Sequence, residues 1–371
     1  MIEQQIVDNQ KRFFISGETR PYDFRMQKLS VLEKLLTENE ALLCEAVYED
    51  FGKPYFEAWS AEIATVLHEI NFHKKNLKNW MKPEPVSNSL FTFPAKNRVR
   101  YQPYGTTLII GAWNYPIHLL LHPLAGAISA GNTSVLKPSE LSPLVADTIQ
   151  NLVNQYFSPE YLTVIKGDAD TAQNLLKQPF DKIFFTGSSR VGKIVMKAAA
   201  ENLTPVTLEL GGKSPAIVHS DADIKTAAKR IWWGKCLNAG QTCVAPDYVM
   251  CHRELFDKFV KETKNTLKDF YADSPIFSEG YTQIVNKNHY RRLLSLLENA
   301  DIIHGGISNA DKRMIEPTLV HANEDDEIMK EEIFGPILPV LIYESLNDAI
   351  KYINSKPSPL ALYLFTNVSD V

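Results

Sequence analysis

Apolar residues recur every three or four positions through the first 80 residues of the chain. This spacing places them on one face of a helix, where they can pack against another layer. The two clearest series are Met26, Leu29, Leu32, Leu36, Leu43 and Val47, and Trp59, Ile63, Val66, Leu67 and Ile70. We therefore expect residues 1–80 to form a helical lead whose apolar faces belong to a core.

The helical pattern ends at a proline-containing break over residues 83–88. Residues 90–104 then alternate apolar and polar side chains, with Pro94 and Pro103 near the margins. Alternation predicts an extended chain, and proline is tolerated in strands mainly at an edge. The pattern thus predicts an edge hairpin or an extended arm over about residues 88–104.

From Thr106 onward, short apolar runs alternate with helical patterns. The runs cover residues 108–110, 134–136, 162–165, 182–185 and 206–208. Continuous apolar strands joined by helices are typical of a parallel sheet that is buried on both faces. Ligands bind such sheets beyond the carboxyl ends of the strands, so residues that directly follow each run are candidates for a site.

A second set of elements begins near residue 216. Helical patterns cover residues 224–235, 253–267 and 346–353, and strand-like runs cover residues 216–218, 302–303, 317–320, 337–343 and 361–365. We therefore divide the chain into two α/β domains, 1–210 and 211–371. The run at 361–365 lies so close to the end of the chain that we expect it at the edge of its sheet.

Length, charge and cysteine content exclude several classes of protein. A chain of 371 residues is longer than one ordinary core serves, and a net charge of −5 attracts neither nucleic acid nor anionic lipid. The four cysteines are too few for a disulfide framework, and they have no spaced partners for a metal site. The N-terminus has no leader pattern, and no apolar run could span a bilayer. We expect a cytoplasmic protein without a metal ion, a membrane segment or a nucleic-acid partner.

Cys243 follows a Gly-Gln turn within residues 238–246 and precedes Pro246, where a strand is expected to begin. At such a loop-to-strand junction, backbone N–H groups can point at a ligand. A thiolate there would be a strong nucleophile. The alternative is a small buried apolar residue, which is the commonest environment of a cysteine.

Two polar residues follow strands of the predicted sheet. Asn114 comes after the run 108–110, and its carboxamide could donate a hydrogen bond to a developing oxyanion. The alternative for Asn114 is the cap of a helix that begins near Pro116. Glu209 follows the run 206–208, and apolar neighbours would suit its carboxylate to general-base work on water. The alternative for Glu209 is a surface glutamate at a turn.

Two further stretches at strand ends could bind a dinucleotide. Lys137 and Glu140 flank a Pro-Ser turn, and a carboxylate there would accept hydrogen bonds from a ribose and repel a 2′-phosphate. The alternative is a capping pair before a helix. Residues 187–193 fit G-x-x-x-x-G-K, but Ile194 replaces the hydroxyl residue that binds Mg²⁺ in a P-loop. Ser189 stands where G-x-G-x-x-G needs glycine, so a dinucleotide phosphate site of another pattern is predicted.

Six stretches, in this order and at this spacing, resemble motifs of the aldehyde dehydrogenase superfamily. They are WNYP, KPSE, FTGSSRVGK, LELGGKSP, GQTCVAPDY and EEIFGP. The resemblance runs from the first helices to residue 371 and is closest to the class 3, or fatty-aldehyde, branch. It implies an α/β fold with a Rossmann-like parallel-sheet NAD-binding domain over 1–210, a catalytic domain over 211–371 and a small extended bridging arm.

The same resemblance assigns roles to residues that match the motifs. It implies Cys243 as the nucleophile, Glu209 as the general base, and Asn114 as an oxyanion donor whose partner is the backbone N–H of Cys243. The implied contacts with the cofactor, which is NAD with NADP possible, are Trp113, Lys137, Glu140, Gly187, Ser188, Val191, Gly192, Glu332 and Phe334. Tyr115 and Trp233 are implied to line the path of the aldehyde. Taken by themselves, residues 331–336 are equally consistent with a plain loop.

The implied reaction is NAD(P)-dependent oxidation of a medium- or long-chain aliphatic or aromatic aldehyde to the carboxylic acid. The thiolate of Cys243 adds to the carbonyl, a thioester forms as hydride leaves, and Glu209 activates the water that releases the acid. Family members continue for several dozen residues past the position of Phe365. The resemblance therefore implies a chain without its C-terminal end, and a homodimer if that segment is present. The alternative is a truncated, inactive nucleotide-binding remnant of the same fold.

Overall fold

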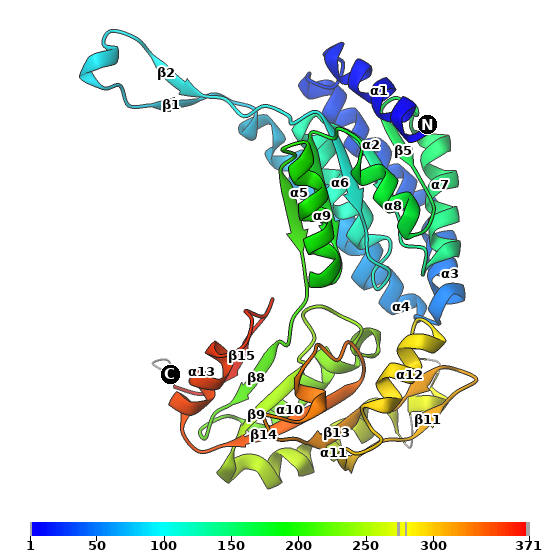
Figure 1. The fold of residues 1–371 in the computed structure, drawn as a ribbon, viewed down its shortest axis with the longest axis vertical. Coiled ribbons are helices and arrows are strands. Elements are labelled where there is room, and N and C mark those ends of the chain that lie inside the picture. Colours follow the sequence, from blue (N-terminus) through cyan, green and yellow to red (C-terminus); the bar gives the residue numbers. More distant parts are fainter. Residues whose placement is uncertain (1, 273–274, 279, 369–371) are drawn as a thin grey trace. The chain divides into compact units, whose positions relative to one another are not determined.

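The computed structural model describes residues 2–272, 275–278 and 280–368 (Figure 1). It divides into two compact units. Unit 1 comprises Met1–Val47 and Ala58–Glu209, and unit 2 comprises Tyr48–Glu57 and Leu210–Val371. The segment 48–57 was assigned to the first domain from the sequence, whereas the structure groups it with unit 2. One reason is that the N–H of Gln283 donates to the carbonyl of Phe51 at 3.1 Å.

The helical lead is present over most of residues 1–80. Its elements are α1 (Ile2–Ile15), α2 (Tyr22–Glu38), α3 (Glu40–Phe51), α4 (Tyr55–Ala58), the π-helical turn η1 (Trp59–Ile63) and α5 (Ala64–Trp80). Most of the apolar series predicted for the core is buried: Leu29, Leu32, Leu36, Val66 and Ile70 are each 0% exposed. The prediction is wrong for Trp59, which is 36% exposed, and Met26 and Leu67 are only half-buried. Both α2 and α5 pack against α6 (His118–Ala130) of the following region. The helical periodicity thus correctly marked a buried face.

Unit 1 contains a five-stranded sheet in the order β5-β4-β3-β6-β7, with every neighbouring pair parallel. The strands are β3 (Thr106–Ile110), β4 (Thr133–Lys137), β5 (Leu162–Val164), β6 (Lys182–Thr186) and β7 (Val206–Glu209). The other helices that connect them are α7 (Pro143–Tyr156), α8 (Ala169–Leu176) and α9 (Ser189–Glu201). All residues of β3 and β4 are buried, as expected for strands covered on both faces.

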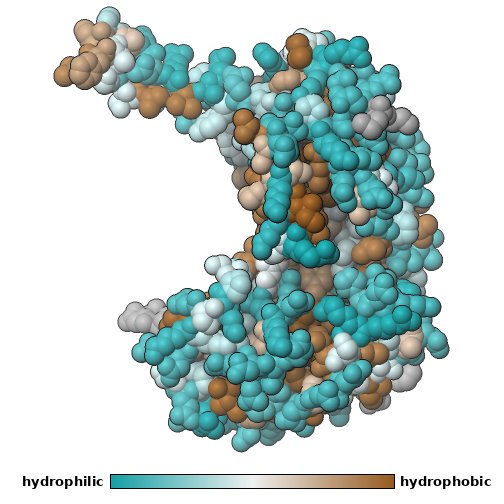
Figure 2. Space-filling view, viewed as in Figure 1, coloured by the Kyte–Doolittle hydropathy of each residue, from teal (hydrophilic) through white to brown (hydrophobic). Residues whose placement is uncertain are grey.

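The predicted arm is a two-stranded antiparallel hairpin of unit 1. It consists of β1 (Glu84–Val86) and β2 (Asn97–Val99), with the short 3-10 turn η2 (Leu90–Thr92) between them. The first strand lies before the predicted bounds, in the stretch 83–88 that was expected to be a break, because both strands of a two-stranded hairpin are edge strands and tolerate Pro85. Figure 1 shows it extending away from the helices of its own unit. Its tip is apolar and exposed, with Leu90 94%, Phe91 101% and Phe93 79% accessible, and is brown in Figure 2.

Unit 2 contains a six-stranded sheet in the order β10-β13-β14-β9-β8-β15. The strands are β8 (Pro215–Val218), β9 (Tyr248–His252), β10 (Asp301–His304), β13 (Thr318–His321), β14 (Ile337–Tyr343) and β15 (Tyr363–Phe365), and only β10 pairs antiparallel. A small separate sheet pairs β11 (Ser308–Asn309) with β12 (Met314–Ile315). As predicted, β15 lies at an edge.

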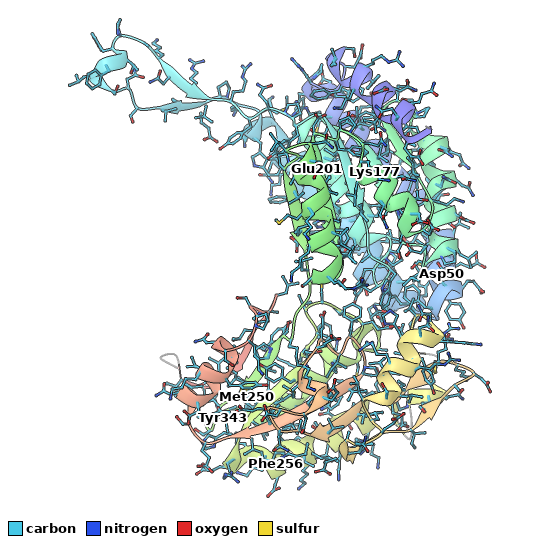
Figure 3. The ribbon with its side chains drawn as sticks, in the orientation of Figure 1. Asp50, Lys177, Glu201, Met250, Phe256 and Tyr343 are labelled. Atoms are coloured by element: carbon cyan, nitrogen blue, oxygen red, sulfur yellow. The ribbon has the colours of Figure 1, made fainter. Side chains whose placement is uncertain are left out.

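Helices cover both faces of this sheet. They are α10 (Ile224–Cys236), α11 (Phe256–Tyr271), α12 (Lys287–Ser295) and α13 (Leu346–Asn354), with short 3-10 turns η3 (Leu237–Gly240), η4 (Arg253–Leu255), η5 (Pro275–Phe277) and η6 (Glu327–Met329). Met250 and Tyr343, labelled in Figure 3, belong to the core cluster on one face. Val249 and Cys251 alternate with Met250 along β9 and join Trp232 of α10 in the cluster on the other face. Because successive side chains of β9 enter the cores on opposite faces of the sheet, every buried position of the strand needs an apolar residue.

Neither a membrane-spanning helix nor a metal-binding cluster is found in the described part of the chain. Among residues 2–272, 275–278 and 280–368, no helix is both long enough and apolar enough to cross a membrane. Within the same ranges, no group of three or more His, Cys, Asp and Glu side chains is arranged to hold a metal ion.

Candidate active site

The residues assigned to the site from the sequence lie in both units. Unit 1 carries Trp113, Asn114, Tyr115, Lys137, Glu140, Gly187, Ser188, Val191, Gly192 and Glu209, and unit 2 carries Trp233, Cys243, Glu332 and Phe334.

Strand order places a binding edge in unit 1 at β3 and β6. The chain proceeds from β3 outward through β4 to β5, then returns to β6 and proceeds outward to β7 on the other side. The connections that leave β3 and β6 therefore diverge, which opens a crevice at the carboxyl ends of these two strands. Because Ile110 pairs with Phe185, the turns that begin at Gly111 and Gly187 lie beside each other. The sheet thus brings two of the predicted motifs together.

Asn114 lies in the turn between β3 and α6. Asn114 is only 3% exposed, and the N-cap residue of α6 is Ile117. The alternative role of Asn114 as the helix cap is therefore wrong. Two long-range contacts fix the turn: Ser142 Oγ donates to the carbonyl of Trp113 at 3.2 Å, and Glu62 Oε2 accepts the N–H of Ile117 at 2.8 Å. Glu62 is a residue that the sequence analysis missed.

The turn after β6 has the features of an anion site. Gly187 is required there, since a Cβ would lie 2.6 Å from the ring of Phe185. Ser188 is the N-cap of α9, and its hydroxyl accepts a long hydrogen bond from the N–H of Val191 at 3.4 Å. A helix N-terminus carries partial positive charge, which favours phosphate. Within the described residues, the buried hydroxyl of Thr186 makes no hydrogen bond, so a donor or acceptor is left for a ligand at this edge.

Lys137 and Glu140 form a pair at the carboxyl end of β4. Lys137 Nζ lies 3.2 Å from Glu140 Oε2 and donates to the carbonyl of Pro138 at 2.9 Å. The following helix, α7, has Ser142 as its N-cap with no side-chain cap, so the alternative of a capping pair is wrong. The lysine side chain is 3% exposed and the glutamate side chain 48%, which leaves the carboxylate accessible to a ribose.

Glu209 is the last residue of β7 and is exposed. The apolar surroundings expected for its carboxylate from Leu208 and Leu210 are not found. One reason is the strand order, because β7 is the edge strand of its sheet and no further strand covers its outer side. The carboxylate is therefore accessible to water on its own unit.

The four cysteines fall into two classes. Cys44, Cys236 and Cys251 are buried, and burial raises the pKa of their thiols to about 11, about 12 and about 12 respectively. Cys243 is partly exposed. The alternative of a buried apolar residue thus describes the other three cysteines and does not describe Cys243.

A buried ion pair organises the loop that carries Glu332. Lys213 Nζ lies 2.6 Å from Asp247 Oδ2 and donates to the carbonyls of Ile328 and Glu331 at 3.0 Å each. Asp247 Oδ1 accepts the N–H of Ile333 at 3.0 Å. Lys213 lies in the LELGGKSP stretch and Asp247 in GQTCVAPDY, so the motifs contained this pair although the sequence analysis gave it no role.

Glu332 is a half-buried carboxylate. Burial raises its pKa to about 7; a hydrogen bond from the N–H of Gly212 opposes the rise, the charge of Asp247 adds to it, and Lys235 and Lys213 oppose it. Burial likewise lowers the pKa of Lys235 to about 8, and its Nζ makes no hydrogen bond to any residue that the structure describes. A Cβ on Gly211 would lie 2.4 Å from a Glu332 oxygen, so glycine leaves space for this side chain.

The remaining predicted residues are Phe334, Trp233 and Tyr115, and they differ in backbone conformation and exposure. Phe334 has a φ of 51°, a left-handed conformation that is uncommon outside glycine and clusters at functional sites. Trp233 on α10 is 64% exposed, whereas Tyr115 is 7% exposed. Trp233 is thus free to contact an apolar molecule from the surface of unit 2, and Tyr115 packs within unit 1.

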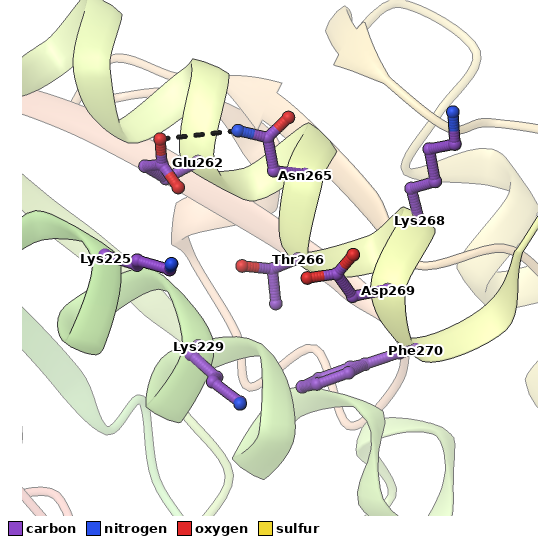
Figure 4. Close-up of a pocket in the computed structure, with 8 residues that line it drawn as sticks. All are labelled: Lys225, Lys229, Glu262, Asn265, Thr266, Lys268, Asp269 and Phe270. Atoms are coloured by element: carbon purple, nitrogen blue, oxygen red, sulfur yellow. Dashed lines mark hydrogen bonds between the residues drawn. The ribbon is translucent and has the colours of Figure 1, made fainter.

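A surface pocket between α10 and α11 holds none of the predicted residues (Figure 4). It is lined by Lys225, Lys229, Glu262, Asn265, Thr266, Lys268, Asp269 and Phe270. Lysines and carboxylates are mixed along these two helices, as on ordinary solvated faces. The amide Nδ2 of Asn265 donates a hydrogen bond to Glu262 Oε1 at 3.3 Å. We assign the pocket no role in the chemistry.

Comparisons with known proteins agree with these features. The profile of the "Aldehyde dehydrogenase family" matches residues 4–371. The chain is 49% identical over 369 residues to the 4,4'-diaponeurosporen-aldehyde dehydrogenase of Staphylococcus aureus (strain NCTC 8325 / PS 47), covering 99% of this chain and 80% of that relative. It is 44% identical over 367 residues to the "Aldehyde dehydrogenase, dimeric NADP-preferring" of Mus musculus, covering 99% and 81%. A substrate-bound structure of Staphylococcus aureus AldH matches with a TM-score of 0.97 and 48% identity, covering 100% of this chain and 81% of that one.

Proposed function

This chain belongs to the aldehyde dehydrogenase family and oxidises aldehydes to carboxylic acids with NAD(P)⁺, and on that premise we propose that its substrates are medium- or long-chain aliphatic or aromatic aldehydes. The resemblance to the class 3, or fatty-aldehyde, branch supports this choice, as does a relative named for a diaponeurosporen aldehyde. The exposed Trp233 offers an apolar contact for such a chain. The observation that carries the proposed role of Cys243 as nucleophile is that Cys243, within GQTC, is the one cysteine of the four that is not buried.

In the proposed mechanism the thiolate of Cys243 adds to the aldehyde carbon, and the carbonyl electrons move to oxygen. Asn114 and the backbone N–H of Cys243 stabilise that oxyanion, and one such donor is worth about 2.7–4 kcal/mol of barrier. NAD(P)⁺, when bound, supplies the hydride acceptor. Glu209 then takes a proton from water as the water oxygen attacks the thioester, which releases the acid and restores the thiolate.

The side chains present fit a dinucleotide. The turn Gly187 to Gly192 with Ser188 and Val191 would hold phosphate, and the buried, unbonded hydroxyl of Thr186 lies at the same edge. Lys137 and Glu140 would hold one ribose, and Glu332 and Phe334 the other. Trp113 lies in the turn after β3, beside the phosphate turn.

The test of the substrate class is a panel of aldehydes of increasing chain length, with NADH formation followed by absorbance. Each buried CH₂ is worth ~0.8 kcal/mol, so kcat/KM should rise about fourfold per added CH₂ until the chain leaves the protein. Benzaldehyde should also be turned over. Equal efficiency for acetaldehyde and decanal would contradict the proposed substrate class, and no turnover of any aldehyde would support the inactive remnant.

We expect NAD⁺ to be preferred to NADP⁺ because the accessible carboxylate of Glu140 repels a 2′-phosphate. The pair with Lys137 offsets part of that charge, so the preference should be roughly fivefold in kcat/KM, the ratio that about 1 kcal/mol of repulsion in water produces. Glu140→Gln should abolish it. The control is Glu201→Gln, at the C-terminal end of α9 and so at the opposite end of the sheet (Figure 3). Equal efficiencies in the unaltered protein would refute this role of Glu140.

We also propose a homodimer in which the hairpin tip of one chain packs on a second copy. Leu90, Phe91 and Phe93 are almost fully exposed, and a relative is named as dimeric. Replacing Leu90 and Phe91 together by serine should weaken the dimer more than tenfold, because burying each side chain is worth roughly 1.5–3 kcal/mol. Sedimentation at several concentrations measures it, with Lys96→Ser on the same hairpin as the control. An unaltered chain that sediments as a monomer would end this proposal.

The proposed location is the cytoplasm. All four cysteines are free thiols, which suits a reducing compartment.

A further inference from the structure

The turn directly before the nucleophile has a strained backbone. Asn238, Ala239 and Gly240 have φ values of 52°, 51° and 74°, so three successive residues are left-handed. The left-handed conformation costs an ordinary residue roughly 1–2 kcal/mol and persists only where surrounding contacts enforce it. Gly240 is obligatory, since a Cβ there would lie 2.2 Å from the carbonyl oxygen of Gly335. Asn238 and Ala239 are not glycine, so surrounding contacts must hold them in this conformation.

One of the groups that hold this turn is the side chain of Gln241, which is 0% exposed. Its Nε2 donates to the carbonyls of Asn238 and Gln283 at 3.0 Å each, and its Oε1 accepts the N–H of Val285 at 3.0 Å. In return, Asn238 Nδ2 donates to the carbonyl of Gln241 at 3.1 Å. These bonds close the turn on itself and tie it to the chain at 283–285.

The second group that holds the turn is the carboxylate of Glu57, a residue far from Asn238 in sequence. Helix α10 ends at Cys236, so the N–H of Asn238 has left the helical ladder and needs another acceptor. Glu57 Oε1 accepts this N–H at 2.6 Å, and Thr282 Oγ1 lies 3.4 Å from Glu57 Oε2. A carboxylate that accepts a buried N–H makes a stronger hydrogen bond than a neutral acceptor.

We propose that Glu57 is a positioning residue for Cys243: its carboxylate holds the N–H of Asn238, keeps the turn left-handed, and thereby orients the thiol and backbone N–H that follow. This explains why residues 48–57 group with unit 2, since they deliver Glu57 to the turn. The inference rests on the proposed role of Cys243 as nucleophile. Without Glu57, the buried N–H of Asn238 loses its acceptor, and the turn can relax toward the ordinary right-handed conformation.

The test compares Glu57→Ala, Glu57→Asp and Glu57→Gln. The readouts are the rate of alkylation of Cys243 by iodoacetamide, mapped by peptide mass, and kcat for decanal. The amide oxygen of glutamine reaches the N–H of Asn238 as the carboxylate does, so Glu57→Gln should stay within about threefold of the unaltered protein. Aspartate keeps the charge but is one CH₂ too short, and alanine offers no acceptor. Both should slow alkylation and kcat by about tenfold or more, with the Kd of NAD⁺ unchanged.

A matched control separates positioning from general loss of stability. Tyr281→Phe removes another buried hydrogen bond of unit 2, from the hydroxyl to the carbonyl of Ile315 at 2.9 Å. It should lower the melting temperature without slowing alkylation of Cys243. The inference is overturned if folded Glu57→Asp or Glu57→Ala alkylates at the unaltered rate, or if Glu57→Gln is no faster than Glu57→Ala. If the alkylated cysteine is not Cys243, the proposed function fails instead.

Discussion

Replacing Cys243 by serine should remove aldehyde oxidation, with kcat/KM lower by roughly a thousandfold or more. The reason is the nucleophile, because an alkoxide is far harder to form near neutral pH than a thiolate. No histidine lies close to Cys243 in sequence to act as its base. NADH formation from decanal measures the loss, and Cys44→Ala, which removes a buried thiol of unit 1, should keep the full rate.

Cys243 should also be the cysteine that alkylating reagents modify fastest. Iodoacetamide should label Cys243 first, since burial raises the pKa of the thiols of Cys44, Cys236 and Cys251 to about 11 or about 12 and closes them to the reagent. Peptide mass mapping after short exposure identifies the site. Acylation or faster alkylation of any of the other three would show that the nucleophile has been misassigned.

Glu209→Gln should separate the two halves of the reaction. The thioester can still form, but its hydrolysis loses the base that activates water, a contribution of about 10²–10⁴-fold. A rapid burst of NADH should therefore be followed by a steady-state rate at least about a hundredfold lower. Intact-protein mass should show the trapped acyl group on the chain.

Glu201→Gln is the control for this experiment as well, because it neutralises another exposed carboxylate of unit 1. It should show neither a burst nor a slower steady state. Ordinary turnover by Glu209→Gln would remove Glu209 from the proposed mechanism. The exposure of Glu209 at the end of an edge strand gives water access to the carboxylate, but it is also the environment of an ordinary surface glutamate, so this experiment decides between the two.

The sequence predicted the α/β fold because local patterns encode it. Apolar runs such as residues 108–110 and 182–185 became the buried parallel strands β3 and β6, and helical spacing marked the buried faces of α2 and α5. The motif wording also identified the family, which the comparisons confirm. The catalytic and binding roles of individual residues stay predictions, although the structure removed the helix-cap alternatives for Asn114 and for the Lys137–Glu140 pair.

Tertiary structure alone decided which distant groups support the candidate residues. No periodicity links Glu57 to Asn238 or Glu62 to Ile117, because each contact joins a side chain to a backbone N–H whose need for an acceptor arises only once the turn is folded. Strand order had the same effect at β7, where an edge position exposes Glu209 despite its apolar neighbours. The sequence by itself therefore determined the elements, the family and the chemical groups, since these depend on local composition and spacing. The structure decided burial, partners and backbone strain, since these depend on which segments the fold brings into contact.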